Sequence, residues 1–339
     1  MNHIEQLVSV LRKRRVFIQT HNFPDPDAIA SAYGLQVLLK EMGVESKLIY
    51  DGSMSKLSGI RVTDYFDIEM HHVKDFDDLD EQDAVILIDA QKFNKNCTDL
   101  PCDEVACIDH HPTVFDCEYA YEDIRMVGAA STIVASYLIE MGIEPTKNLA
   151  TILLYGIKMD TADFSRGVSE LDVEVYYHLF PYVDHEILKM LTLNTLELMD
   201  LKAYASAINN ISIYKNIGFA CITFDCPDAL IAIISDFILA LDVVEFSMVY
   251  SIRSGGYKFS VRSELEELDA GKMIKKILDE IGDGNGGGHS FMAGGFLQNA
   301  GVERLGDNPR FEIERRFIKE IYPEDENYEK NTIRIQEIR

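Results

Sequence analysis

The sequence has few basic residues and lacks long apolar runs. Its 32 lysines and arginines stand against 57 aspartates and glutamates, which gives a net charge of -25. This balance argues against a protein that grips long duplexes, because counterion release on nucleic acid needs clustered Lys and Arg. Short anionic substrates stay compatible with it, since metal ions can supply local positive charge. The longest apolar runs, "ALIAIIS" and "DFILAL", are too short to span a bilayer, so we expect no membrane segment.

The sequence also lacks paired cysteines. None of its six cysteines forms a C-x-x-C pair, and the N-terminal stretch "MNHIEQLVSVLRKRRVF" lacks the apolar core of a secretory signal. We therefore expect reduced thiols and a cytoplasmic location. A structural zinc site is a weak alternative, because the cysteine spacing does not match such sites. The cysteines concerned are Cys97, Cys102, Cys107 and Cys117.

The first half of the chain alternates between short β-type and longer helical patterns. With 339 residues, the chain is long enough for two domains. The alternation predicts a parallel α/β sheet covered on both faces. The acidic stretch 75–83 is typical of a solvated connection. The expected strands are 14–20, 46–52, 84–90 and 104–110, and the expected helices are 28–43, 129–142 and 148–160.

The pattern changes near residue 185. A helical stretch at 186–208, as one long helix or two, is a natural linker. Beyond it we expect a smaller α+β domain over 209–325, and a charged, loosely held tail over 326–339. The expected elements of this half are a strand at 217–224, a helix at 227–241, two strands around a Gly255-Gly256 turn, and a helix at 270–282. The α/β domain then spans 1–185.

The stretch "HNFPDPD" carries a histidine and two aspartates around two prolines. Proline fixes its own φ and restricts the residue before it, so we expect Asp25 and Asp27 to be held in extended conformation. Alternation would then turn both carboxylates to similar sides, beside His21. The plainer alternative is that Asp27 only caps the following helix.

Further acidic and histidine residues follow at the ends of predicted elements. In a parallel α/β sheet, ligands bind beyond the carboxyl ends of the strands. Crowded carboxylates repel one another unless cations lie between them, and mixed Asp and His ligands suit Mn²⁺, Mg²⁺ or Fe²⁺. Each residue alone is also compatible with an ordinary strand end, helix end or turn. The residues concerned are Asp89, Asp109, His110, His111 and Asp160.

A second constellation is the run "GNGGGHS". Consecutive glycines let a backbone approach an anion and offer it N–H groups, and an arginine can pair bidentately with a phosphate. A flexible loop is the alternative interpretation of such a run. The expected substrate-binding residues are Gly286, Gly287, Gly288, His289 and, on a neighbouring strand, Arg262.

Taken in order, "HNFPDPD", "LIDA", "IDHH" and "GIKMDT" resemble the four motifs of the DHH phosphoesterases. The second half resembles the DHH-associated domain, with "GNGGGH" as its glycine signature and "FSVRSE" as its arginine strand. The resemblance covers about residues 1–325 and is greatest to the two-domain nanoRNase type. Pro26 and Met292 depart from the usual pattern, and Met292 leaves substrate preference open.

The resemblance implies two divalent metal ions, usually Mn²⁺ with Mg²⁺ as the alternative. It implies that Asp109 orients His110 and that His111 faces the scissile phosphate, so that His111, Asp89 and Asp109 serve catalysis. The implied ligands are His21 and Asp25 for one metal, Asp27, His110 and Asp160 for the other, and Asp89 as a bridge.

The activity implied is hydrolysis of short oligonucleotides to nucleoside monophosphates, with 3′-phosphoadenosine-5′-phosphate as a second substrate. A hydroxide activated by the two metals would attack in line. The expected partners are short single-stranded RNA or small nucleotides, with no long duplex and no membrane, for a monomer or homodimer. The alternatives are a phosphodiesterase for cyclic or linear dinucleotides of the cyclic di-AMP type, and a non-catalytic nucleotide-binding protein. A pyrophosphatase of the family is disfavoured by the glycine run.

Overall fold

The computed structural model describes residues 1–11, 13–54, 59–193, 196–325 and the backbone of 332–334. The chain divides into two compact units, Met1–Thr195 and Leu196–Arg339. The segment expected as a helical linker is therefore divided between them. Helix α7 (His185–Thr192) buries Leu188 and Leu191 in the core of the first unit, whereas α8 (Leu201–Asn209) buries Ala203 and Ala207 in the second.

The first unit contains a parallel sheet with the strand order β3-β2-β1-β4-β5-β6. Every neighbouring pair in it is parallel, and β1 lies between β2 and β4. The sequence pattern missed the short strands β3 and β6. The strands are β1 (Val16–Gln19), β2 (Ser46–Tyr50), β3 (Met70–His72), β4 (Ala84–Ile88), β5 (Asp103–Asp109) and β6 (Tyr121–Ile124).

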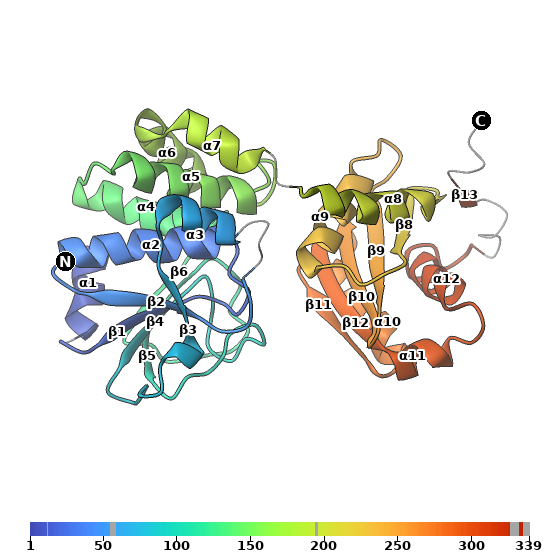
Figure 1. The fold of residues 1–339 in the computed structure, drawn as a ribbon, viewed down its shortest axis with the longest axis horizontal. Helices are drawn as coiled ribbons and strands as arrows, with labels where there is room; N and C mark the ends of the chain where they lie inside the picture. Colours follow the sequence, from blue (N-terminus) through green and yellow to red (C-terminus); the bar gives the residue numbers. More distant parts are fainter. Residues whose placement is uncertain (12, 55–58, 194–195, 326–331, 335–339) are drawn as a thin grey trace. The chain divides into compact units, whose positions relative to one another are not determined.

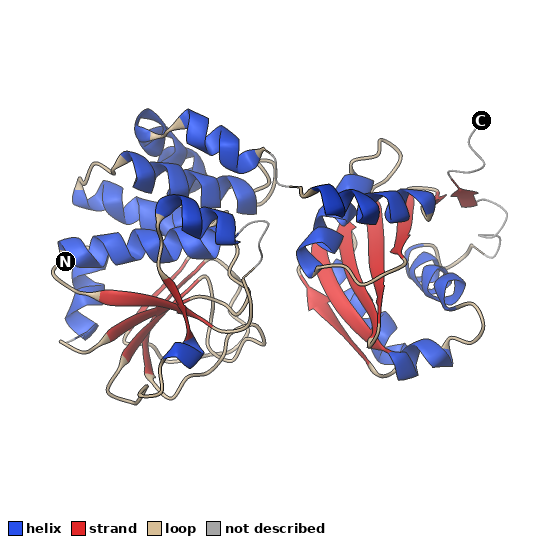
Figure 2. Ribbon diagram, in the orientation of Figure 1, coloured by secondary structure: helices blue, strands red, loops and turns tan. Residues whose placement is uncertain are grey.

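Helices cover one face of this sheet (Figures 1 and 2). Alternate strand residues such as Ile18, Ile86 and Ile108 pack into the core under them. The other face, around Phe17 and Leu87, is covered by loops and the short 3-10 helix η2 (Val73–Asp75), so both faces are covered but longer helices lie on only one of them. The connections 89–102 and 110–120 carry turn-forming residues and no helical period. The remaining helices of the unit are α1 (His3–Leu11), α2 (Pro26–Glu41), α3 (Arg61–Phe66), η2 (Val73–Asp75), α4 (Ala130–Met141), α5 (Lys147–Asp160), α6 (Glu170–Leu179) and η3 (Phe180–Tyr182).

Helix α2 begins directly inside the "HNFPDPD" motif. Asp25 is its N-cap and accepts hydrogen bonds from the main-chain N–H groups of Asp27 and Ala28, both at 3.0 Å. Pro26 occupies the first helical turn, where its missing N–H costs nothing. Asp25 is extended as expected, but Asp27 is helical. The cap is Asp25, which leaves the Asp27 carboxylate available for other contacts.

The acidic stretch 75–83 is only partly solvated. Asp83 is buried, and the Arg15 guanidinium donates to its Oδ1 at 2.7 Å and to its Oδ2 at 2.5 Å. Arg14 donates to main-chain carbonyl groups of the same stretch. Two arginines at the start of β1 thus fasten this connection to the sheet. No helix among the described residues is long and apolar enough to cross a membrane.

The second unit contains a mixed sheet with the order β11-β12-β10-β9-β8-β7-β13. Its strands pair antiparallel except for β8 and β9, which are parallel. Helices α10 and α12 pack on one face, and α8 and α9 on the other. The elements are η4 (Leu198–Asp200), β7 (Ser212–Tyr214), β8 (Ile217–Ile222), α9 (Asp228–Leu239), β9 (Phe246–Arg253), β10 (Gly256–Ser263), α10 (Ala270–Ile281), β11 (Gly284–Gly288), β12 (Met292–Gln298), α11 (Asn299–Arg304), α12 (Pro309–Ile321) and β13 (Thr332–Arg334).

The glycine run forms a strand. Residues Gly284–Gly288 make up β11, which pairs antiparallel with β12 at the edge of the sheet. The alternative of a flexible loop is therefore excluded for these five residues. Of the charged tail, 326–331 and 335–339 lie outside the described residues, and Thr332–Arg334 pairs with β7.

Candidate metal centre

Three neighbouring strands end at the predicted site residues. His21 follows β1, Asp89 follows β4, and β5 runs into the Asp109-His110-His111 sequence. Because β1, β4 and β5 are adjacent and parallel, their carboxyl ends lie at one edge of the sheet. The ligand atoms gather in groups whose members lie within 4.8 Å of one another. These are His21, Asp25 and Asp89; Asp27, His110 and Asp160; and Asp89, Asp109, His110 and His111.

Asp89 lies between the first two groups. Its Oδ1 is 3.2 Å from Nε2 of His110, and its Oδ2 is 3.6 Å from Nε2 of His21. Oδ1 is buried and has no hydrogen-bond partner among the described residues. A buried carboxylate oxygen without a donor is costly unless a cation contacts it. Two ligands on one small divalent ion lie about 3 Å apart, so the observed spacing fits such an ion.

The backbone at Asp89 is left-handed, with φ +53°. A non-glycine residue in this region is uncommon, although Asp tolerates it better than most. The Asp89 N–H donates to the Ile108 carbonyl at 3.0 Å, so the neighbouring strand β5 holds this conformation. The chain turns sharply directly after β4. This turn places the Asp89 carboxylate beside His21 and His110.

Asp27 is held by the start of helix α4. Its Oδ2 accepts from the N–H of Ala130 at 2.7 Å, and its Oδ1 accepts from the N–H of Ser131 at 3.0 Å. A helix N-terminus stabilises a carboxylate at this position. Gly156 on α5 makes the approach possible, because a Cβ there would lie 2.5 Å from Oγ of Ser131. Helices α2, α4 and α5 thus fix this buried carboxylate within reach of His110.

Burial and, after it, mutual repulsion raise the pKa of the carboxylates Asp89 and Asp160 in this cluster. Burial is the main cause that raises the pKa of Asp160 to about 7 and that of Asp89 well above its usual range. Repulsion from Asp27 and Asp25 adds to both shifts. Burial lowers the pKa of His110, but the surrounding carboxylates outweigh it and raise the value to about 11. Such a cluster opposes its own ionisation, and divalent cations would relieve that repulsion.

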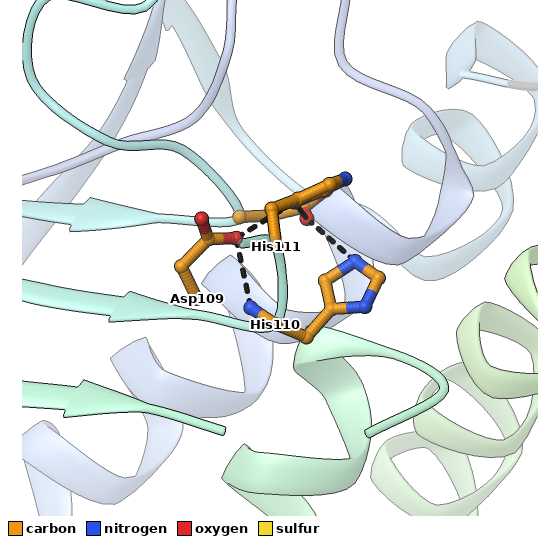
Figure 3. A group of neighbouring side chains, drawn as sticks. Asp109, His110 and His111 are labelled. Carbon is orange, nitrogen blue, oxygen red and sulfur yellow. Dashed lines mark hydrogen bonds and ion pairs between the residues drawn. The ribbon is translucent and has the colours of Figure 1, made fainter. Parts of the chain in front are cut away.

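Asp109 orients His111 rather than the ring of His110. Its Oδ1 lies 2.9 Å from Nδ1 of His111 and accepts from the main-chain N–H of His110 at 2.9 Å (Figure 3). The ring of His110 instead has Nδ1 3.1 Å from the Val127 carbonyl. The implied role of Asp109 toward His110 is therefore corrected. The two histidine rings have separate supports, which directs Nε2 of His110 toward Asp89.

Gln91 is a residue that the sequence patterns missed. Its Nε2 donates to Oδ2 of Asp109 at 2.6 Å and to the His111 carbonyl at 3.0 Å. The side chain is buried. Gln91 therefore holds both Asp109 and His111 in place. The available signal was the position of Gln91, a polar residue two positions after Asp89. Nothing in the sequence linked Gln91 to Asp109, which lies 18 residues further along the chain.

In the second unit, the predicted substrate-binding residues lie on β10 (Arg262), on β11 (the three glycines) and in the turn after β11 (His289), and β12 lies between the two strands. Arg262 on β10 is buried; its Nε donates to Oδ1 of Asp236 at 2.6 Å and its Nη1 to Oγ of Ser260 at 3.0 Å. The ring of His289 stacks on that of Phe291. Successive glycines of β11 face opposite sides of the sheet. A Cβ at Gly286 would meet α10, whereas one at Gly287 would meet open space.

Sequence comparison identifies both parts of the chain. Residues 15–157 match the DHH family N-terminal domain, and residues 215–308 match the DHHA1 domain. An uncharacterized protein of Methanocaldococcus jannaschii is 32% identical over 284 residues, which cover 83% of this chain and 58% of that protein. A probable manganese-dependent inorganic pyrophosphatase of Streptococcus thermophilus is 31% identical over 150 residues, 43% of this chain and 48% of that protein. The chain thus spans about half of the length of these curated relatives.

Structural comparison agrees with this assignment. An exopolyphosphatase-related protein from Bacteroides fragilis superimposes with a TM-score of 0.72, covering 93% of this chain and 97% of that one at 17% identity. At this identity the likeness concerns the fold. The expected architecture, a parallel-sheet domain followed by a smaller α+β domain, is confirmed. The chain therefore carries a DHH family N-terminal domain over residues 15–157, followed by a DHHA1 domain over residues 215–308.

Proposed function

We propose that this protein is a phosphoesterase that depends on two divalent cations, with Mn²⁺ preferred over Mg²⁺, and hydrolyses short oligonucleotides or small nucleotides. One observation carries the proposal: the two oxygens of Asp89 face separate histidine–aspartate groups, and one of them is buried without a donor. Bound cations would neutralise charge on a phosphate and lower the pKa of a nucleophilic water. The names of the streptococcal relatives support manganese as the metal.

The chain's own residues divide into two roles. His21 and Asp25 would hold one cation, Asp27, His110 and Asp160 the other, and Asp89 both. His111 would donate a hydrogen bond to the scissile phosphate. Asp109 holds the His111 ring through Nδ1 at 2.9 Å, which fixes the direction of the opposite ring nitrogen, Nε2. Its hydrogen bonds to His111 and Gln91 lower the pKa of Asp109 against the effect of burial, so it stays an acceptor.

The second domain is proposed to contribute to substrate binding. Gly287 and Gly294 pair across β11 and β12 and form what we call the glycine ledge. Neither has a positive φ, and a Cβ on either would meet no atom closer than 3.4 Å. Glycine in a strand costs roughly 0.5–1 kcal/mol relative to alanine, and it often marks the close approach of a ligand. The fold does not need glycine at these two positions, which supports a role in binding.

Charge around the ledge fits an anionic ligand. Arg262 pairs across from Met292 on β12, and Lys258 pairs across from Phe296, so a cation stands on each side of the Gly294 position. Both cations already contact aspartates, Asp236 and Asp228. A phosphate or sugar hydroxyl would therefore share these cations with the aspartates. Because the whole chain has a net charge of -25, binding should rest on such local contacts and favour short substrates.

A substrate panel tests the proposal. Protein stripped with a chelator would be reloaded with Mn²⁺ or Mg²⁺ and assayed on RNAs of two to five nucleotides, 3′-phosphoadenosine-5′-phosphate, cyclic di-AMP and pyrophosphate. We expect metal-dependent release of nucleoside monophosphates from the short RNAs, and none from Asp89→Asn. Binding of these nucleotides without turnover in either metal would instead favour a nucleotide-binding protein.

Pyrophosphate hydrolysis is the second candidate. The similarity to proteins named manganese-dependent pyrophosphatases, 31–33% identity over about 150 residues, favours it. That similarity covers 43% of this chain. Turnover of pyrophosphate alone in the same panel would establish it over the nucleotide proposal.

A further inference from the structure

Two phenylalanines expose their rings on the loops that leave the candidate metal centre. Phe93 is 54% exposed and Phe115 is 48% exposed. Their rings meet edge to face, with centroids 6.4 Å apart and an angle of 85°. Single exposed apolar residues are common on surfaces, but a contacting pair on two separate loops is an apolar patch. We call these two residues the phenylalanine pair.

The backbone at Phe93 is strained. Its φ is +67°, in the left-handed region that a bulky residue rarely adopts. This conformation is unfavourable for a residue with a side chain, and glycine would remove the cost. The ring contributes little to the core, because more than half of it is exposed. Folding alone therefore does not account for phenylalanine at this position, and strain of this kind concentrates at functional sites.

The loop that carries Phe93 is held firmly. The N–H of Lys92 donates to the hydroxyl of Tyr119 at 3.0 Å, and the N–H of Asn94 donates to the Gln91 carbonyl at 3.3 Å. The ammonium of Lys92 lies 5.4 Å from the centroid of the Phe93 ring. The exposure of this ring is consequently a fixed feature of the surface.

The phenylalanine pair is tethered to the metal centre on both sides. Phe93 follows Asp89 by four residues and Phe115 follows His111 by four residues. Four residues span at most about 14 Å of chain. Gln91, between Asp89 and Phe93, donates to the carbonyl of His111, so the two loops are joined at their base.

The opposite edge of the sheet offers a contrast. Among the described residues, the connections 42–45 and 79–83 at the amino ends of the strands expose no large apolar side chain. At the carboxyl edge, the loop after β1 also exposes a large apolar side chain, because Phe23 is 60% exposed. Of the connections compared, those on the edge that carries the ligands are therefore the ones that expose aromatic rings.

We infer that the phenylalanine pair stacks against a nucleobase of the substrate, next to the phosphate that the centre hydrolyses. This inference rests on the proposed function and narrows it to base-bearing substrates. In complexes with single-stranded nucleic acid, a flat aromatic base gains affinity by stacking on an aromatic side chain. Pyrophosphate and polyphosphate have no group that would use such a patch.

The test compares two ligands on the Mn²⁺-loaded, full-length protein. One is the 5′-phosphorylated dinucleotide pApA, and the other is its abasic analogue with the same sugar–phosphate chain. The variants are Phe93→Gly and Phe115→Ala, with Phe180→Ala as a matched control, because Phe180 is 45% exposed and lies after α6. We expect KM for pApA to rise at least about fivefold in the first two variants, with metal content and the abasic analogue unaffected. Phe93→Gly should also keep or raise Tm, since it removes the strain.

Other outcomes would overturn the inference. Equal losses on both ligands would mean that the pair supports the centre itself, and no loss on either would mean that no base contacts it. A change in oligomeric state of Phe93→Gly, seen by light scattering, would make the pair an interface between copies. If the wild-type protein binds pApA but hydrolyses neither ligand, the proposed activity is wrong. The role of the phenylalanine pair is then decided by comparing the affinities of the same variants for pApA and for the abasic analogue.

Discussion

At the scale of single residues, the candidate centre depends on side chains that support one another rather than on its ligands alone. Gln91 shows this most clearly. It contacts no ligand oxygen of Asp89, yet it holds Asp109 at 2.6 Å and the carbonyl of His111 at 3.0 Å. A residue that acts through His111 should affect turnover without affecting metal binding.

We expect Gln91→Leu, which keeps the side-chain size and removes both donors, to lower kcat roughly 10- to 100-fold with little change in KM or metal content. Gln91→Leu should have little further effect in a His111→Asn background, because both changes remove the same contribution. Gln36→Leu is the matched control, since Gln36 donates to the Ser46 carbonyl at 2.8 Å and lies in the second half of helix α2, past the site residues at its start. Additive losses in the double variant would refute action through His111.

At the scale of helices and strands, the sheet edge was predictable and its surroundings were not. Strand ends at Asp89 and Asp109 followed from apolar runs that stop at an acidic residue. The cap at Asp25 instead of Asp27 could not be predicted, because both aspartates suit an N-cap and the choice depends on contacts of Asp27 with Ala130 and Ser131, a hundred residues away. The opposite orientation of Gly286 and Gly287 could not be predicted either. Neighbouring residues face opposite sides only in a strand, and the sequence alone left a loop possible for this glycine run.

The glycine ledge provides a prediction about strand β12. Gly294→Ala should leave Tm unchanged or raise it, because a Cβ there meets only the Phe259 carbonyl at 3.4 Å. Its KM for short oligonucleotides should nevertheless rise. Gly295→Ala is the matched neighbour on the other side of the strand and should lower Tm, since its Cβ would lie 2.5 Å from Leu278. Thermal unfolding and KM of both variants check this; a gain in Tm without a change in KM would remove the ledge from binding.

Strand β1 carries a pH-dependent contribution to stability. The hydrogen bond from Arg15 lowers the pKa of Asp83, with burial opposing it. A lowered carboxyl pKa in the folded state stabilises above the unfolded value of about 3.9, and this stabilisation is lost as the pH falls through the folded value. Arg15→Met should thus reduce the free energy of unfolding by about 1–2 kcal/mol at pH 7 and by less near pH 3. Denaturant unfolding across this range gives the difference, and a constant difference would exclude the ion pair as its source.

At the scale of the whole molecule, charge limits the substrate. A net charge of -25 disfavours general electrostatic capture of a long polyanion, so the protein should depend on its metals and a few cations. We expect kcat/KM to be highest for RNAs of about two to five nucleotides and to fall steeply for 24-mers and for duplex DNA. A length series at two salt concentrations measures this. Equal rates on 24-mers would show that a long strand is held after all.

The proposed function depends most on one bridge, the carboxylate of Asp89 between two metal sites. Its most direct test is the metal content of dialysed protein, measured by mass spectrometry after loading with Mn²⁺, for the wild type and Asp89→Asn. The amide keeps the size of the side chain and tolerates the left-handed backbone. We predict about two Mn²⁺ per wild-type chain, and in the variant at most one together with loss of hydrolysis. Two Mn²⁺ per chain in Asp89→Asn with activity retained, or a single ion in the active wild-type protein, would contradict the account.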